Sequence, residues 1–189
     1  MTTMHEGFPK TVTLKDGTEL TLRLMTRDDE HDLSRFFGGL PDESRRYLSA
    51  EATDRRVIAR WMRELDYEKK LPLLAELEGR IVASATLLRQ TFGWGRHVGE
   101  VRVVIAPEYQ GRGLGGILLD EIGAIGAQGG LRKLVARIVT GRSDIIRALE
   151  RAGFRSVAVL KEYVKDAGGH YADLAILVRE LTTGPTART

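Results

Sequence analysis

The stretch from Gly99 to Leu119, GEVRVVIAPEYQGRGLGGILL, decides the fold class. It begins as an apolar β-strand, passes through a short connection at 106–110, and becomes glycine-dense before an apolar helix starts. Glycines in such a junction allow positive φ and let a ligand approach the backbone. The first N–H groups of a helix lack internal acceptors, and the helix dipole adds positive potential there. The junction therefore predicts a site for phosphate groups.

Two familiar phosphate-binding motifs do not fit this junction. A Walker A loop needs a lysine and a hydroxyl residue after its last glycine, whereas Ile117 and Leu118 follow Gly116. The glycine spacing at 111, 113 and 116 matches the dinucleotide fingerprint, but residues 106–110 separate these glycines from the strand end. The strand that follows also lacks the acid that would hold a ribose hydroxyl. We set both motifs aside.

Upstream of the junction, the pattern predicts a β-hairpin and three helices. Strands at 11–15 and 19–25 flank Asp16-Gly17, a strong hairpin turn signal. Thr26 is placed to cap a helix over 27–37, which Gly38-Gly39 would end. A short helix starts near Pro41, and a third covers 54–67.

From residue 71 onward the hydrophobic period changes to that of strands. Strands at 71–77, 80–89 and 98–105 predict an antiparallel meander. A helix to about residue 128, a strand, a helix capped by Ser143, and two final strands follow; the last four elements are expected at 131–139, 143–152, 154–161 and 171–178. The order predicts an α/β fold, with a central mixed β-sheet flanked by helices.

Composition is that of one globular domain. The 189 residues are 42% hydrophobic and 29% charged, which suits a single core. We expect that domain at 11–181, between a flexible N-terminus (1–10) and a disordered tail (182–189). No apolar run reaches the roughly 18 residues of a membrane span, and no signal peptide is evident. We therefore expect a cytoplasmic protein with no membrane partner.

Composition also limits the chemistry. The chain has no cysteine, which excludes disulfides and a cysteine nucleophile. Its four histidines show no metal-ligand spacing, so we expect no metal. The net charge of +3 is small, and the basic residues are interspersed with acids, so we expect no nucleic-acid partner.

The junction resembles the GNAT acetyltransferase superfamily. Its signature is Gln or Arg, two residues, Gly, one residue, then Gly or Ala; here Gln110, Gly113 and Gly115 stand in that register after a strand and a proline-containing link. Together with the order of elements, the resemblance covers roughly residues 18 to 180. It implies a GNAT acyl-CoA N-acyltransferase fold and acetyl-CoA as co-substrate.

The resemblance also implies which residues hold the coenzyme. Backbone groups near Val103, Val104 and Ile105 would pair with the pantetheine arm, which behaves as an added strand. A gap is therefore expected where strand 98–105 parts from strand 133–139. The pyrophosphate would lie on the segment from Gln110 to Gly116, that is Gln110, Gly111, Arg112, Gly113, Leu114, Gly115 and Gly116.

Glu100 is the candidate general base. An amine attacks a thioester only after it loses a proton, and a nearby carboxylate can accept that proton. By strand alternation Glu100 shares a face with Arg102 and Val104. Related bacterial lysine acetyltransferases are similar here, with a glutamate in this register serving as base. The other interpretation is an ion pair of Glu100 with Arg102 or Arg96.

The residues at the positions that carry the family's general acid and its neighbouring asparagine differ from the family pattern. Many members carry a tyrosine and an asparagine before the Gly-Phe that follows the penultimate helix. Gly153-Phe154 is present, but Leu149 and Arg142 stand at those two positions. Tyr109, Tyr163, solvent or no acid at all would then serve, while Arg142 would either approach the coenzyme's phosphates or stay solvated.

We expect the acceptor to be an amine of a protein lysine or of a small molecule such as an antibiotic or polyamine. The segment from Leu22 to Tyr47 resembles the start of bacterial protein-lysine acetyltransferase domains, and 159–174 resembles the end of that group and of some small-amine acetyltransferases. A non-catalytic acyl-CoA sensor or interaction module is the alternative function. Edge strands at both ends of the sheet make a homodimer possible.

Overall fold

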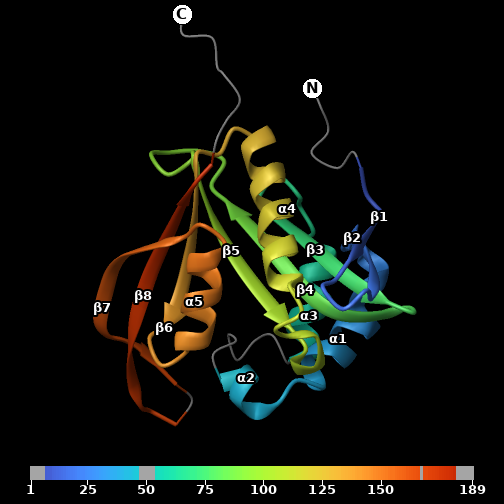
Figure 1. Ribbon diagram of the computed structural model, residues 1–189, viewed down its shortest axis with the longest axis horizontal. Coiled ribbons are helices and arrows are strands. Elements are labelled where there is room, and N and C mark those ends of the chain that lie inside the picture. The colour runs from blue at the N-terminus through green and yellow to red at the C-terminus, as the bar shows by residue number, and fades with distance from the viewer. Residues whose placement is uncertain (1–6, 47–53, 167, 182–189) are drawn as a thin grey trace, which may run out of the picture.

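The computed structural model describes residues 7–46, 54–166 and 168–181, which contain one mixed sheet of eight strands (Figure 1). The order of strands across the sheet is β1-β2-β3-β4-β5-β6-β8-β7. All neighbours are antiparallel except β5 and β6, which are parallel. The strands are β1 (Lys10–Thr13), β2 (Glu19–Leu24), β3 (Lys70–Leu77), β4 (Arg80–Arg89), β5 (Val98–Ile105), β6 (Lys133–Val139), β7 (Arg155–Lys165) and β8 (Tyr171–Glu180).

Helices cover both faces of the sheet (Figure 1). One face packs on α4 (Leu114–Gln128) and α5 (Ser143–Arg151), and the other on α1 (Glu30–Gly38) and α3 (Arg55–Arg63). A short α2 (Asp42–Arg46) lies between α1 and α3 in the sequence, and two 3-10 turns precede α1 and α4, at η1 (Arg27–Asp29) and η3 (Pro107–Tyr109). The predicted mixed α/β architecture is therefore confirmed. None of the helices in the described ranges is long and apolar enough to cross a membrane.

Local sequence signals explain most element boundaries. Gly17 takes a φ of 86° in the β1–β2 turn, and the β3-β4-β5 meander has the predicted order. Thr26 forms a capping box with Asp29, and Asp54 caps α3 through the N–H of Arg56. The prediction for Ser143 was wrong: Arg142 is the residue before α5, Ser143 is already helical, and no side chain caps this end. Of the predicted terminal segments, residues 1–6 and 182–189 lie outside the described residues.

Strand alternation divides β5 between the two faces. Val101, Val103 and Ile105 contact the core under α4, whereas Val104 contacts the core under α1 and α3. Glu100 and Arg102 share the face of Val104, as the alternation predicted. Lys70 of β3 lies on this face too, because it is paired with Leu88, and Leu88 is paired with Glu100.

The sheet forks between β5 and β6. These strands pair only from Val98 opposite Lys133 to Glu100 opposite Val135, after which no described residue continues the ladder. In Figure 1 the two strands diverge below that point. Gly99 sits in the paired part, where an added Cβ would lie 2.7 Å from side-chain atoms of both Leu87 and Leu131. A side chain there would have to displace both leucines, which are themselves fully buried, so the closed end of the fork is tightly packed.

Edge strands lie at both ends of the sheet, as expected. β7 exposes apolar side chains, among them Val157 at 59% and Tyr163 at 62% of their area. Such an edge is a surface on which a second chain could pair. The homodimer itself stays a prediction.

Candidate active site

The glycine segment, residues 111–116, presents main-chain N–H donors at the start of α4. Gly111 and Gly113 take φ values of 74° and 93°, in the left-handed region that disfavours side chains. Gly113 is the residue before the helix and no side chain caps it. None of the described residues accepts a hydrogen bond from the main-chain N–H groups of 111–116. These N–H groups and the helix dipole together favour an anion.

Individual residues of the glycine segment differ in what they can contribute to ligand binding. The side chain of Leu114 is fully buried, so only its main chain faces a ligand. An added Cβ at Gly115 would lie 3.4 Å from Ile105, which shows that this glycine packs the helix against β5. Gly116 has no atom within 4 Å of that position, so it borders open space.

The β1–β2 turn lies against the glycine segment. The N–H of Lys15 donates to the carbonyl of Arg112, and the aliphatic chain of Lys15 lies 3.2 Å from the position of a Cβ on Gly113. Arg112 forms an ion pair with Asp16 at 3.0 Å. A hydrogen bond from Thr18 and the charge of Arg112 lower the pKa of Asp16. The turn therefore holds Arg112 and brings the Lys15 amino group beside the glycines.

Gln110 and Arg142 meet at one cavity. The amide of Gln110 donates to the carbonyl of Ile105 at 2.9 Å, which fixes the connection to the end of β5. Arg142 pairs with Asp144 at 3.3 Å and lowers the pKa of its carboxyl. Gln110, Arg142 and Asp144, with Pro41, Ser44, Pro107 and Gly141, line a cavity of about 410 Å³ between the starts of α2, η3 and α5.

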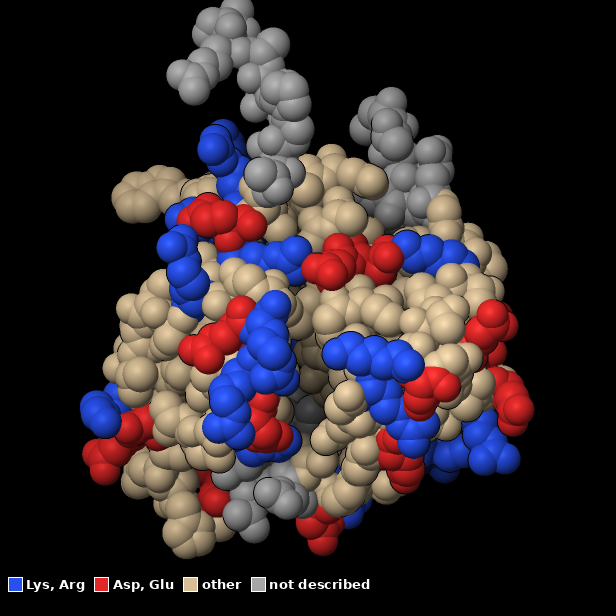
Figure 2. Space-filling view, in the orientation of Figure 1, with Lys and Arg blue, Asp and Glu red and all other residues tan. Residues whose placement is uncertain are grey.

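Basic side chains flank a depression beside this region. Figure 2 shows the surface hollowed near its centre, between the places of α5 and of the loop before α4 in Figure 1, with Lys and Arg side chains on both sides. Positive charge on both walls suits a polyanionic ligand.

Beyond the fork, the edge of β5 that faces β6 has no strand partner among the described residues. Val103, Val104 and Ile105 all lie in this part of β5, past the last paired residue, Glu100. β6 pairs along its whole length with β8, so its other edge is likewise free of ladder partners beyond Val135. The gap expected between these strands is present.

Glu100 stands at the last paired position of the fork. Its side chain is 20% exposed and accepts from Arg102 at 2.9 Å and pairs with Arg137 of β6 at 3.5 Å. The ion pair with Arg102 was one of the alternatives, and it is present; Arg96 forms no ion pair with Glu100. The carboxylate is thus partly accessible and held in place by a guanidinium from each strand.

The positions considered for a general acid have different surroundings. Leu149 is 6% exposed and packs in the core under α5, so the position of the family's tyrosine is filled by core packing. Tyr109 is partly buried, with the Arg112 guanidinium 5.4 Å from its ring centre. Tyr163 is 62% exposed on β7.

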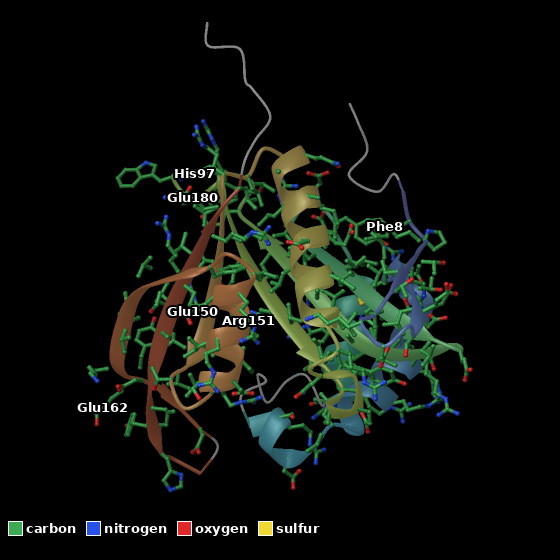
Figure 3. All side chains as sticks on the ribbon, viewed as in Figure 1. Phe8, His97, Glu150, Arg151, Glu162 and Glu180 are labelled. Carbon is green, nitrogen blue, oxygen red and sulfur yellow. The ribbon has the colours of Figure 1, made fainter. Side chains whose placement is uncertain are left out.

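The aromatic loop before β5 lies away from this site. His97 precedes β5 and lies in Figure 3 at the end of the sheet remote from the glycine segment, which follows β5. Trp94 is fully exposed and Phe92 is 82% exposed, so neither side chain packs at the hairpin tip. Within the described ranges there is no group of three or more acidic or histidine side chains placed to hold a metal.

Three residues near the site were not identified from the sequence. Lys15 reaches the glycines through a turn remote in sequence, and Arg137 reaches Glu100 through a strand register that no local pattern reveals. Lys70 lies with its amino group 3.9 Å from the ring centre of Trp61. The only sequence signal for Lys70 was strand alternation, which puts it on the same face of the sheet as every second residue of β3.

Comparisons with known proteins agree with this geometry. The profile of the family described as the acetyltransferase (GNAT) family matches residues 32–154. The GNAT domain of S. lividans PAT is 24% identical, with 91% of this chain and 96% of that one covered and a TM-score of 0.74. Two acetyl-CoA complexes are also similar: yncA of Salmonella typhimurium (21% identity, 90% and 100% covered, TM-score 0.73) and a phosphinothricin acetyltransferase of Sinorhizobium meliloti (20%, 89% and 94%, 0.72). A search of curated proteins found no match.

The fold and the profile match together define the class as a GNAT N-acetyltransferase. The match spans more than half of the sequence, and the chain belongs to the acetyltransferase (GNAT) family.

Proposed function

We propose that this chain transfers the acetyl group of acetyl-CoA directly to a primary amine, on a protein lysine or on a small molecule, with Glu100 as general base. The observation that carries the proposal is the position of Glu100. It lies at the point where β5 and β6 part, and the same strand β5 leads directly to the unpaired N–H groups of 111–116.

The free groups around the fork fit the coenzyme. The N–H groups of 111–116 suit a diphosphate, and Gln110 would support them by fixing η3 to β5. The unpaired edge from Val103 to Ile105 suits the amide-containing pantetheine arm, which would complete the interrupted ladder. Arg142 would add positive charge from the other side of the cavity. When bound, the coenzyme supplies the activated acetyl thioester.

Glu100 would prepare the acceptor. Its carboxylate, directly or through one water, removes a proton from the ammonium group, so that the nitrogen lone pair becomes available. The nitrogen then bonds to the acetyl carbon, the carbon–sulfur bond breaks, and the thiolate takes a proton from solvent, Tyr109 or Tyr163. Arg102 and Arg137 orient the carboxylate at the fork.

Release of free thiol tests the function directly. Because the chain contains no cysteine, a thiol reagent added to the reaction reports only coenzyme A released from acetyl-CoA. The assay would compare a lysine peptide, polyamines and amino acids with a reaction that lacks amine. Amine-dependent thiol release, with a mass increase of one acetyl group on the amine, is the expected result. Thiol release no faster than without amine across the panel would refute catalysis.

Similar structures carry names that span several amine classes. One is a spermidine N-acetyltransferase of Vibrio cholerae, and another is a phosphinothricin acetyltransferase. We take from these names only the range of the assay panel, since fold does not fix the acceptor.

A non-catalytic acyl-CoA sensor is the second candidate. The observation that favours it is Leu149, which is buried at the position where many family members carry a tyrosine. A sensor would bind acetyl-CoA and leave its thioester intact with every amine in the panel.

A further inference from the structure

The face of the sheet that carries Glu100 also carries three cations from three different strands. Arg102 lies beside Glu100 on β5, Arg137 reaches it from β6, and Lys70 lies on β3. Lys70 and Glu100 are both paired to Leu88 of β4, which puts them about 10 Å apart at ordinary strand spacing. The acceptor has to approach Glu100 over this face.

The side chain of Lys70 is held in place by an aromatic ring. Its ammonium group lies 3.9 Å from the ring centre of Trp61, a cation–π contact that fixes the side chain. No carboxylate of the described residues pairs with it, whereas the nearby acids do have partners: Asp66 pairs with Lys69, and Glu68 with Arg89. Burial lowers the pKa of the Lys70 amino group, and the charge of Arg102 lowers it further. A bound anion would relieve both effects.

Arg102 and Arg137 are open to a ligand as well. Their side chains are 61% and 53% exposed, and the single carboxylate of Glu100 is shared between them. Among these four described side chains, three cations face one carboxylate, which leaves an excess of positive charge. A polycationic amine would be repelled here, while an anion on the substrate would complete the pairing.

We propose that the acceptor is a small amine that carries its own oxyanion, such as a carboxylate, with Lys70, Arg102 and Arg137 as the residues that select it. This inference rests on the proposed function, since it uses Glu100 as the place of the amine. The spacing from Glu100 to Lys70 suits an anion only a few bonds from the nitrogen. Lys70 contacts the anion and so acts as a specificity-determining residue.

The test uses pairs of amines that differ by one carboxylate: L-lysine with cadaverine, and L-phenylalanine with phenethylamine. Calorimetry on the protein, with and without coenzyme A, gives the Kd of each amine, and thiol release gives kcat/KM. We expect the carboxylated member of each pair to bind at least about tenfold more tightly. Lys70→Met should reduce that ratio to below about threefold, because it keeps the side-chain length and removes the charge.

Matched variants separate recognition from structure. Lys70→Arg should keep the preference, and Lys69→Met, at a neighbouring lysine that pairs with Asp66, should leave it unchanged. If Lys70→Met does not fold, Arg137→Gln provides a second reduction of the ratio. Equal or reversed affinities within the pairs, a ratio unaffected by the variants, or no binding by any of the four amines would overturn the inference. Carboxylate-dependent binding without thiol release would refute the proposed acetyl transfer and would still show that these cations select an amine that carries an anion.

Discussion

Glu100 and Arg137 form an ion pair across the closed end of the fork, with 3.5 Å between the carboxylate oxygen and Nε of the guanidinium. The two residues come from the two strands that separate at this point, β5 and β6. The pair therefore fixes a partly exposed carboxylate where the interrupted ladder begins, and this is the position from which it could reach an acceptor amine.

Replacing Glu100 with Gln should lower kcat by about 100-fold or more, because a general base typically contributes that much. The Kd for acetyl-CoA should stay the same, since the glycine segment proposed to bind the diphosphate follows the other end of β5. Steady-state kinetics and calorimetry provide the two values. Glu180→Gln is the matched control: Glu180 also pairs with a cation, Lys133 at 3.0 Å, and lies on β8, outside the gap between β5 and β6. A pH–rate profile unaltered in Glu100→Gln would remove this residue from the mechanism.

Replacing Gly113 with Ala should weaken coenzyme binding by about tenfold or more. A side chain at a φ of 93° costs about 1–2 kcal/mol, and the new Cβ would also push against Lys15. Gly130→Ala is the control, since Gly130 has a φ of 81° in open space at the other end of α4. Both variants should lose similar stability in thermal melts, and only Gly113→Ala should lose affinity. Equal affinity of the two variants for the coenzyme would contradict the role of the glycine segment in binding it.

Replacing Lys15 with Met should raise the Kd of coenzyme A about fivefold, the ~1 kcal/mol of an exposed ion pair. The substitution keeps the aliphatic chain that covers Gly113 and removes only the ammonium group. The effect should shrink at high salt, because exposed charges are screened. Lys10→Met on the same hairpin, where Lys10 pairs with Glu121, is the comparison and should bind normally. Salt-independent affinities that match wild type would show that Lys15 does not contact the ligand.

Replacing Asp29 with Asn should reduce the free energy of unfolding by about 2 kcal/mol at neutral pH, because Arg23 binds this buried carboxylate with two hydrogen bonds. Burial raises the pKa of Asp29, but hydrogen bonds from Arg23 and Thr26 outweigh it, so the net pKa lies below the usual 3.8. The native carboxylate therefore adds stability above pH 3.8 that is lost as pH falls through the lower native pKa.

Denaturant titrations of Asp29→Asn and wild type at several pH values provide the measurement. The gap between them should be full near pH 6 and close as the pH drops below 3.8. Asp28→Asn, at the exposed neighbouring residue, is the control with little expected change. A gap that widens in acid would show that the native pKa is raised instead.

Much of the fold could be predicted because its signals are local. The hydrophobic alternation of 71–105 fixed three strands, and Asp16-Gly17 and Thr26 marked a turn and a helix start that the structure contains. Family resemblance added the diphosphate site at residues 110–116, which stays a prediction, and the gap between β5 and β6, which is present. Ser143 was misjudged because a hydroxyl before a helix signals a cap only if the backbone leaves it outside the first turn.

The partners of the candidate site could not be predicted, because they depend on long-range register. The contact of Arg137 with Glu100 requires the offset of two parallel strands separated by α4, and the contact of Lys15 with Gly113 requires the packing of a hairpin on a distant loop.

The central claim is that the main-chain N–H groups of 111–116 hold the diphosphate of acetyl-CoA while Glu100 lies beside the thioester. Amide chemical shifts of labelled protein, recorded during a titration with coenzyme A and repeated with acetyl-CoA, test it most directly. The account predicts that the largest saturable shifts fall on residues 103–105 and 111–116, with a change at Glu100 that differs between the two ligands. Shifts confined to other surfaces, or an unchanged spectrum at millimolar coenzyme, would contradict it.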